Sequence, residues 1–189
     1  EIAQCLVGSE MCIRDRNSWG IVGGGLFSKS LSRDARFSLG GYAGGMYDVH
    51  VKNSWYVQPQ LLFTYEEFRS KTRLGTDSFF SKFNLELPIL ASYNVALNNK
   101  WNLRINAGPY LSYAMFGRDK SIDYAYGNGM HSSLGWWHQD FPDHFTYGGR
   151  AGVSLESEHF IYTIDGKCSL RKRPFGQSVS LSAGVGYKF

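Results

Sequence analysis

The sequence has no long apolar run, and this lack excludes one large class of membrane protein. No stretch approaches the roughly 18 consecutive apolar residues that a membrane-spanning helix requires. Only 43% of the residues are hydrophobic, and the mean hydropathy is −0.29. Strands that alternate apolar and polar residues lower the mean hydropathy, so these values remain compatible with a membrane β-barrel.

Cysteine is also scarce, with three in 189 residues. Residues 6–16 resemble a translated sequencing adapter, so we expect residues 1–16 to be an artefact and residues 17–189 to form one domain. On this interpretation Cys5 and Cys12 are not native, and a missing signal peptide says nothing about export. Cys168 alone cannot form an internal disulfide, and no Cys or His spacing is typical of zinc. We therefore expect no metal and no cofactor.

Apolar residues recur at every second position in many parts of the chain, which is the side-chain repeat of a β-strand. Apolar residues occupy every second position near the C-terminus: Val179, Leu181, Ala183, Val185, Tyr187 and Phe189. The same pattern predicts eight strands in all, at residues 19–27, 37–51, 55–65, 83–95, 101–115, 145–155, 160–170 and 177–189.

The connections between these strands alternate in length. Residues 52–54, 97–100 and 157–159 are short links, and residues 28–36, 69–82, 117–143 and 171–176 are longer ones. Short turns at one end and long loops at the other are typical of outer-membrane barrels. The sequence thus predicts an all-β fold, a closed antiparallel eight-stranded transmembrane β-barrel with short periplasmic turns and longer extracellular loops.

Aromatic residues mark the two ends of the apolar faces, as expected for girdles at the two membrane interfaces. Those beside short turns or termini are Trp19, Trp55, Tyr93, Trp101, Phe160, Tyr187 and Phe189; those at the long-loop end are Phe27, Phe37, Tyr65, Phe83, Tyr113, Phe145 and Tyr147. We interpret the apolar face as lipid-facing, because a narrow lumen could not hold so many rings. The alternative is a soluble lipocalin-like barrel with an apolar cavity.

Three segments, Val57–Tyr65, Leu85–Ala91 and Ala107–Leu111, resemble the Bacteroidetes-type outer-membrane β-barrel family, which includes PorT-like proteins. The resemblance implies an exported barrel whose C-terminal aromatic residue, here Phe189, is recognised by the barrel-insertion machinery. The segments contain Pro59, Pro88 and Pro109, which cannot donate ladder hydrogen bonds, so we expect bulges there.

The inward faces are predicted to carry a charge network of Glu66, Glu86, Arg104, Arg150, Asp165 and Lys167, together with Asp48. One interpretation is a polar path for ions or protons. We favour a mutually neutralising plug, because an eight-stranded barrel leaves room for little besides side chains and buried charges must pair. The pairing depends on strand stagger, which the sequence does not reveal.

Two features of the long-loop end suggest binding. Basic residues form a predicted phosphate-binding collar for lipopolysaccharide: Arg33, Arg36, Arg69, Arg73, Arg171, Lys172 and Arg173, with Lys29, Lys71 and Lys82 nearby. Trp136 and Trp137 are a candidate contact surface for a glycan or protein. Generic solubilising charge is the alternative for the collar, and nucleic acid is not an expected partner of an exported barrel.

We therefore expect a non-enzymatic outer-membrane protein that has a structural or binding role through its loops, in contact with lipid and lipopolysaccharide. A PorT-like role in secretion or envelope assembly is included in this expectation. The alternatives are a small porin-like channel and a lipid A-modifying enzyme that uses the loop residues Ser132 or Ser133 with His131 or His138.

Overall fold

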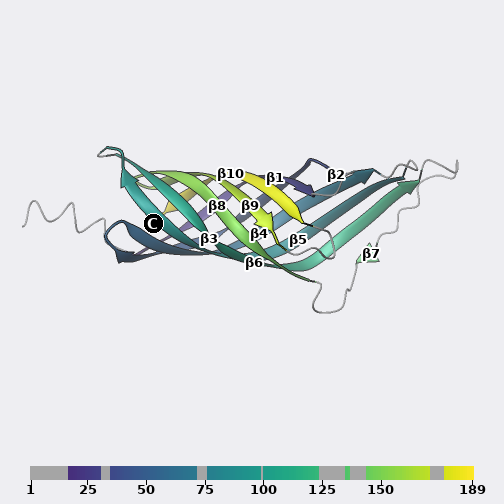
Figure 1. The fold of residues 1–189 in the computed structure, drawn as a ribbon, viewed down its shortest axis with the longest axis horizontal. Coiled ribbons are helices and arrows are strands. Elements are labelled where there is room, and N and C mark those ends of the chain that lie inside the picture. The colour runs from purple at the N-terminus through teal and green to yellow at the C-terminus, as the bar shows by residue number, and fades with distance from the viewer. Residues whose placement is uncertain are drawn as a thin grey trace, which may run out of the picture.

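The computed structural model describes residues 17–30, 35–71, 76–98, 100–123, 135–136, 144–170 and 177–189. Eight long strands form the barrel: β1 Ser18–Ser30, β3 Ser38–Lys52, β4 Trp55–Lys71, β5 Thr76–Ala96, β6 Trp101–Asp123, β8 Phe145–Ser157, β9 Phe160–Ser169 and β10 Ser178–Lys188. Each pairs antiparallel with the next, and β1 pairs with β10 to close the ring (Figure 1). The described part of the chain has no helix long and apolar enough to span a membrane.

Most apolar side chains point outward and most polar ones point inward, as the alternation predicts, although some apolar side chains such as Leu62 and Leu90 are buried in the interior. Leu87, Ile105 and Val185 are 44%, 50% and 48% exposed. Gln58, Glu86 and their even-numbered neighbours on β4 and β5 are buried in the interior. A lipocalin-like barrel requires the opposite arrangement, so that alternative is wrong.

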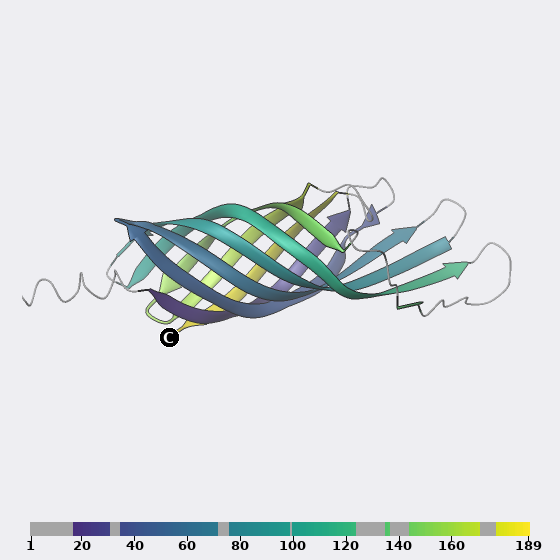
Figure 2. The ribbon, with the colours of Figure 1, turned by 90° about the horizontal axis from the view of Figure 1, so that it is seen from below.

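Three neighbouring strands continue beyond the end of the barrel. β4, β5 and β6 are 17, 21 and 23 residues long, and the β5–β6 pairing runs up to Thr76 and Asp123. Figure 2 shows these strands projecting past the rim of the barrel. The two-residue strands β2 (Ala35–Arg36) and β7 (Gly135–Trp136) pair with β4 and β6 on either side of this projection.

The projection corrects two predicted loops. Residues 69–71, 76–82 and 117–123 were expected in loops, but they lie in strands that form regular antiparallel ladders. Mixed sequences such as residues 117–123 lack the period-two apolar face of a barrel wall. Their cross-strand partners, which the sequence pattern does not reveal, supply the hydrogen bonds that keep them extended.

The expectation of bulges at the three strand prolines is wrong. Register shifts occur elsewhere, between His50 and Lys52 and between Phe83 and Asn84. Each proline keeps a register partner on one neighbouring strand: Pro59 faces Ile89, Pro88 faces Tyr110 and Pro109 faces Gly149. On the second neighbouring strand, the proline has no register partner, and the pairing on either side of this gap keeps the same register. A local gap therefore accommodates the missing N–H without an inserted residue.

Asparagine residues stabilise two of the short turns. Asn53, between β3 and β4, has a φ of 54°, a left-handed conformation that asparagine tolerates better than most residues. Between β5 and β6, the side-chain oxygen of Asn98 accepts hydrogen bonds from the backbone N–H groups of Lys100 and Trp101, at 2.9 and 2.8 Å.

Candidate functional site

The interior at the short-turn end holds four charged side chains from four strands. The Arg104 guanidinium lies 2.8 Å from Asp48 and 2.7 Å from Glu156. The Lys188 ammonium lies 2.5 Å from each of the same two carboxylates. We call Asp48, Arg104, Glu156 and Lys188 the turn-end cluster. Each acid contacts both bases, so the cluster is neutral and links β3, β6, β8 and β10.

A second neutral group, the loop-end cluster, consists of Glu66, Lys82, Glu86 and Lys167. Glu66 lies 2.9 Å from Lys82 and 2.8 Å from Lys167, and Lys167 lies 2.5 Å from Glu86. Asn84 and Thr64 add hydrogen bonds to the two carboxylates. All four charged residues are buried. Burial of charge on this scale is tolerable only because every carboxylate has a cationic partner and further hydrogen bonds.

Between the two clusters, the middle of the barrel interior contains the Arg150–Asp165 ion pair and the side chain of Tyr42. Arg150 donates to Asp165 at 2.8 Å, and the Arg150 guanidinium lies 5.7 Å from the ring centre of Tyr42. The Tyr42 hydroxyl lies 3.3 Å from Thr163 Oγ1. This hydroxyl occupies the space that a Cβ at Gly184 would need, so a glycine on β10 makes room for a tyrosine from β3.

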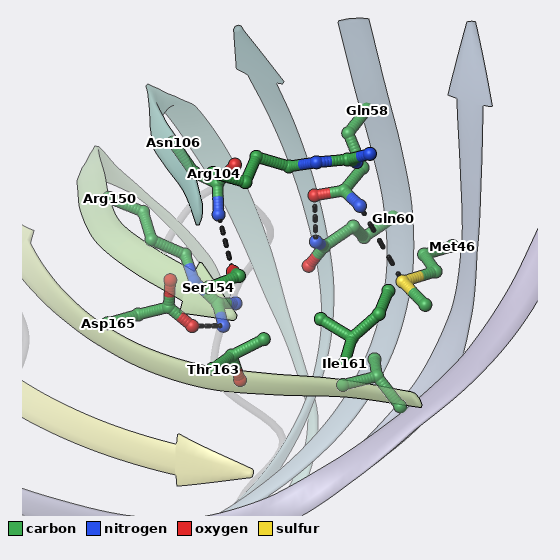
Figure 3. Close-up of a pocket in the computed structure, with 11 residues that line it drawn as sticks. Met46, Gln58, Gln60, Arg104, Asn106, Arg150, Ser154, Ile161, Thr163 and Asp165 are labelled. Carbon is green, nitrogen blue, oxygen red and sulfur yellow. Dashed lines mark hydrogen bonds and ion pairs between the residues drawn. The ribbon is translucent and has the colours of Figure 1, made fainter. Parts of the chain in front are cut away.

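Side chains fill the lumen almost completely. The central cavity is bounded by the Arg150–Asp165 pair, by Arg104 and by amide side chains such as Gln60 and Asn106, as Figure 3 shows, and its volume is about 10 Å³. About one water molecule occupies such a volume. The described interior is therefore polar and largely filled by side chains, as expected for eight strands.

The structure brings the predicted interior charges together and adds others. Glu66, Glu86, Arg104, Arg150, Asp165 and Lys167 are all buried and ion-paired, as is Asp48. Sequence reasoning missed Glu156 and Lys188 as members: Lys188 lies on the polar face of a predicted strand, and Glu156 lies one residue past the end of another. Lys82 was assigned to the rim beside a loop; it points inward to Glu66, because β5 begins earlier than expected.

The aromatic residues of the predicted girdles lie on the outer wall. Trp19, Phe27, Trp55, Phe83, Tyr93, Tyr147, Phe160, Tyr187 and Phe189 are exposed, and Tyr65, Trp101, Tyr113 and Phe145 are half-buried. Many form pairs at the same end, such as Trp19 with Phe189 and Tyr65 with Phe83. Two groups of outward rings at opposite ends are thus present; their role at membrane interfaces stays a prediction.

Most of the predicted binding residues lie outside the described part. These are Arg33, Arg73, Trp137 and residues 171–173, as well as the loop serines and histidines of the enzymatic alternative. The backbones of Arg36 and Arg69 are described, and the two are cross-strand partners on β2 and β4. Trp136 pairs with Arg118 on β6. Lys29 is exposed on β1, with its ammonium 4.9 Å above the Phe37 ring.

Comparison with known proteins agrees with this architecture. Residues 3–187 match the family described as "Outer membrane protein beta-barrel domain". The fold is similar to Neisserial surface protein A (15% identity, TM-score 0.57, covering 92% of this chain and 99% of that one). It is also similar to Ail, the attachment invasion locus protein of Yersinia pestis, solved with the heparin analogue sucrose octasulfate (13% identity, TM-score 0.50, same coverage). No curated protein matches the chain.

Proposed function

Because the chain belongs to the outer membrane protein β-barrel domain family, we propose that it is a surface-binding protein, in which the barrel is the anchor and the loop end is the binding surface. The protein lies in the bacterial outer membrane. The observation that carries the proposal is the contrast between the filled barrel interior and the extended loop end. The lumen is packed with mutually neutralised charges, whereas β4, β5 and β6 continue past the rim.

The ligand class we propose is a polyanion, either the phosphates of lipopolysaccharide or a sulfated glycan. The basic collar at this end supports it: Arg33, Arg36, Arg69, Arg73, Arg171, Lys172 and Arg173. Arg36 and Arg69 occupy directly opposed register positions on β2 and β4, so two of the collar residues are cross-strand neighbours. Ail, with a similar fold, was crystallised with a heparin analogue, so a barrel of this type can hold a sulfated ligand.

On the outer wall, we propose that the two groups of aromatic rings lie at the two lipid–water interfaces. Tryptophan and tyrosine favour this environment, because an apolar ring and a polar tip are both accommodated there. Trp136 and Trp137 would extend the binding surface to glycan rings.

The experiment measures binding of the refolded protein to lipopolysaccharide and to heparin. The test variant reverses charge at the collar (Arg171→Glu, Lys172→Glu, Arg173→Glu). The matched control reverses Lys52 and Lys100, which are exposed at the opposite end. We expect the first variant to lose binding and the second to keep it, with affinity that falls as salt increases. Equal binding by all three proteins would contradict the proposal.

Two other roles remain as proposals with tests of their own. A PorT-like role rests on the sequence resemblance at Val57–Tyr65, Leu85–Ala91 and Ala107–Leu111; deletion of the gene should then reduce the set of secreted proteins. The absence of enzymatic activity is likewise a proposal. Mass spectrometry of lipid A from cells with and without the protein tests it, and an altered lipid A would contradict it.

A further inference from the structure

Four polar atoms of residues that line the central cavity have no hydrogen-bond partner among the described residues. They are Gln60 Oε1, Asn106 Oδ1, Arg104 Nε and Arg150 Nε. Their residues line one small interior cavity of about 10 Å³ and are at least nine-tenths buried. An unpaired buried polar group is costly, so four of them around one small space call for a shared partner.

The two amide oxygens are acceptors, and the two guanidinium N–H groups are donors. The orientation of Gln60 is set by its neighbours: its Nε2 donates to Gln58 Oε1 at 3.0 Å, and Gln58 Nε2 donates to Met46 Sδ at 3.6 Å. A flipped Gln60 would place two acceptor oxygens together. Gln60 Oε1 therefore faces the cavity as an acceptor, as does Asn106 Oδ1 while Asn106 Nδ2 donates to Ser154.

We infer that this cavity binds one water molecule, which accepts from the two arginine N–H groups and donates to the two amide oxygens. The volume holds about one water, and a buried water commonly makes two to four hydrogen bonds. A small anion would be repelled by the amide oxygens, and a cation by the two guanidinium groups. Since Arg104 also belongs to the turn-end cluster and Arg150 pairs with Asp165, the water connects the turn-end cluster to the central ion pair.

A crystal structure of the refolded protein tests the inference directly. We expect a solvent peak within hydrogen-bond distance of Gln60 Oε1 and Arg150 Nε. Soaking the crystals in bromide distinguishes an anion, since bromide gives an anomalous signal. An anomalous peak between the arginines would overturn the assignment to water, and so would a cavity without density.

Radiolytic footprinting provides a second readout in solution. Hydroxyl radicals formed from a bound water oxidise adjacent side chains, and Met46 lines the cavity although it is only 5% exposed. We expect Met46 to be oxidised in the native protein. This labelling should be lost in the double variant Gln60→Leu/Asn106→Leu, which removes both acceptors.

The matched control is Asn94→Leu, an equivalent change at a buried interior residue outside the cavity lining. It should leave Met46 labelling unchanged. Heat-modifiable migration in SDS gels confirms that each variant is folded. Native Met46 labelled no faster than buried residues remote from the cavity would overturn the inference even if the double variant failed to fold.

Discussion

The Lys188 ammonium on β10 lies 2.5 Å from the Asp48 carboxylate on β3, so an ion pair spans β1 at the junction where the barrel closes. Both side chains are buried, and both also belong to the turn-end cluster with Arg104 and Glu156. Closure of the ring therefore depends on interior charge pairing as well as on the β1–β10 ladder. This relationship can be tested by removing one charge at a time.

Asp48→Asn should lower the free energy of unfolding by about 3–5 kcal/mol, because it leaves Arg104 and Lys188 with one shared carboxylate. The double variant Asp48→Asn/Lys188→Met should recover part of the loss, since it restores neutrality. Urea unfolding in lipid vesicles, followed by tryptophan fluorescence, provides the measurement. Glu158→Gln in an exposed turn is the control, and strictly additive single effects would argue against charge coupling.

Gly184→Ala should destabilise the barrel by about 1–3 kcal/mol, because the new methyl group would displace the Tyr42 hydroxyl and its contact with Thr163. Gly25→Ala is the matched control, since a Cβ there meets no other atom within 4 Å. The control should be neutral or slightly stabilising, as glycine weakens a strand. The same urea experiment compares the two, and equal effects would mean that Tyr42 does not need the space at Gly184.

The cost of placing a charge on the outer wall should depend on how deep the position lies in the bilayer. Ile164 is exposed near the middle of β9, and Leu170 is exposed just past its loop end. Ile164→Arg should cost about 2–4 kcal/mol and Leu170→Arg about 0–1 kcal/mol, because charge is most costly at the bilayer midplane. Unfolding in lipid vesicles measures both. Equal costs would place the two positions at similar depth and contradict the assigned position of the barrel in the membrane.

The native barrel should show no steady conductance in planar bilayers. The central cavity has room for about one water molecule, and ion-paired clusters occupy both ends of the interior. A porin in the same bilayer serves as the positive control. Discrete, lasting current steps from the pure protein would favour the porin-like alternative over the plugged barrel.

The sequence was sufficient for the barrel itself, because alternation such as that from Val179 to Phe189 reports directly which face of a strand is apolar. It was insufficient for the partners of the interior charges. Lys188 meets Asp48, 140 positions earlier, through the stagger of β10, β1 and β3, and period counting carries no information on stagger. Lys82 was placed at the rim for a different reason: the apolar alternation begins at Phe83, whereas β5 begins at Thr76 and pairs Lys82 with Glu66.

The central claim is that the apolar face of the barrel contacts lipid hydrocarbon. It is tested most directly by electron paramagnetic resonance of spin labels placed singly at Leu87, Ile105 and Val185, with Cys5, Cys12 and Cys168 replaced by serine and the protein reconstituted in lipid vesicles. Each label should be readily reached by dissolved oxygen, which partitions into hydrocarbon, and poorly reached by a water-soluble nickel complex. Labels reached by the nickel complex, or shielded from both reagents, would contradict the membrane-spanning arrangement.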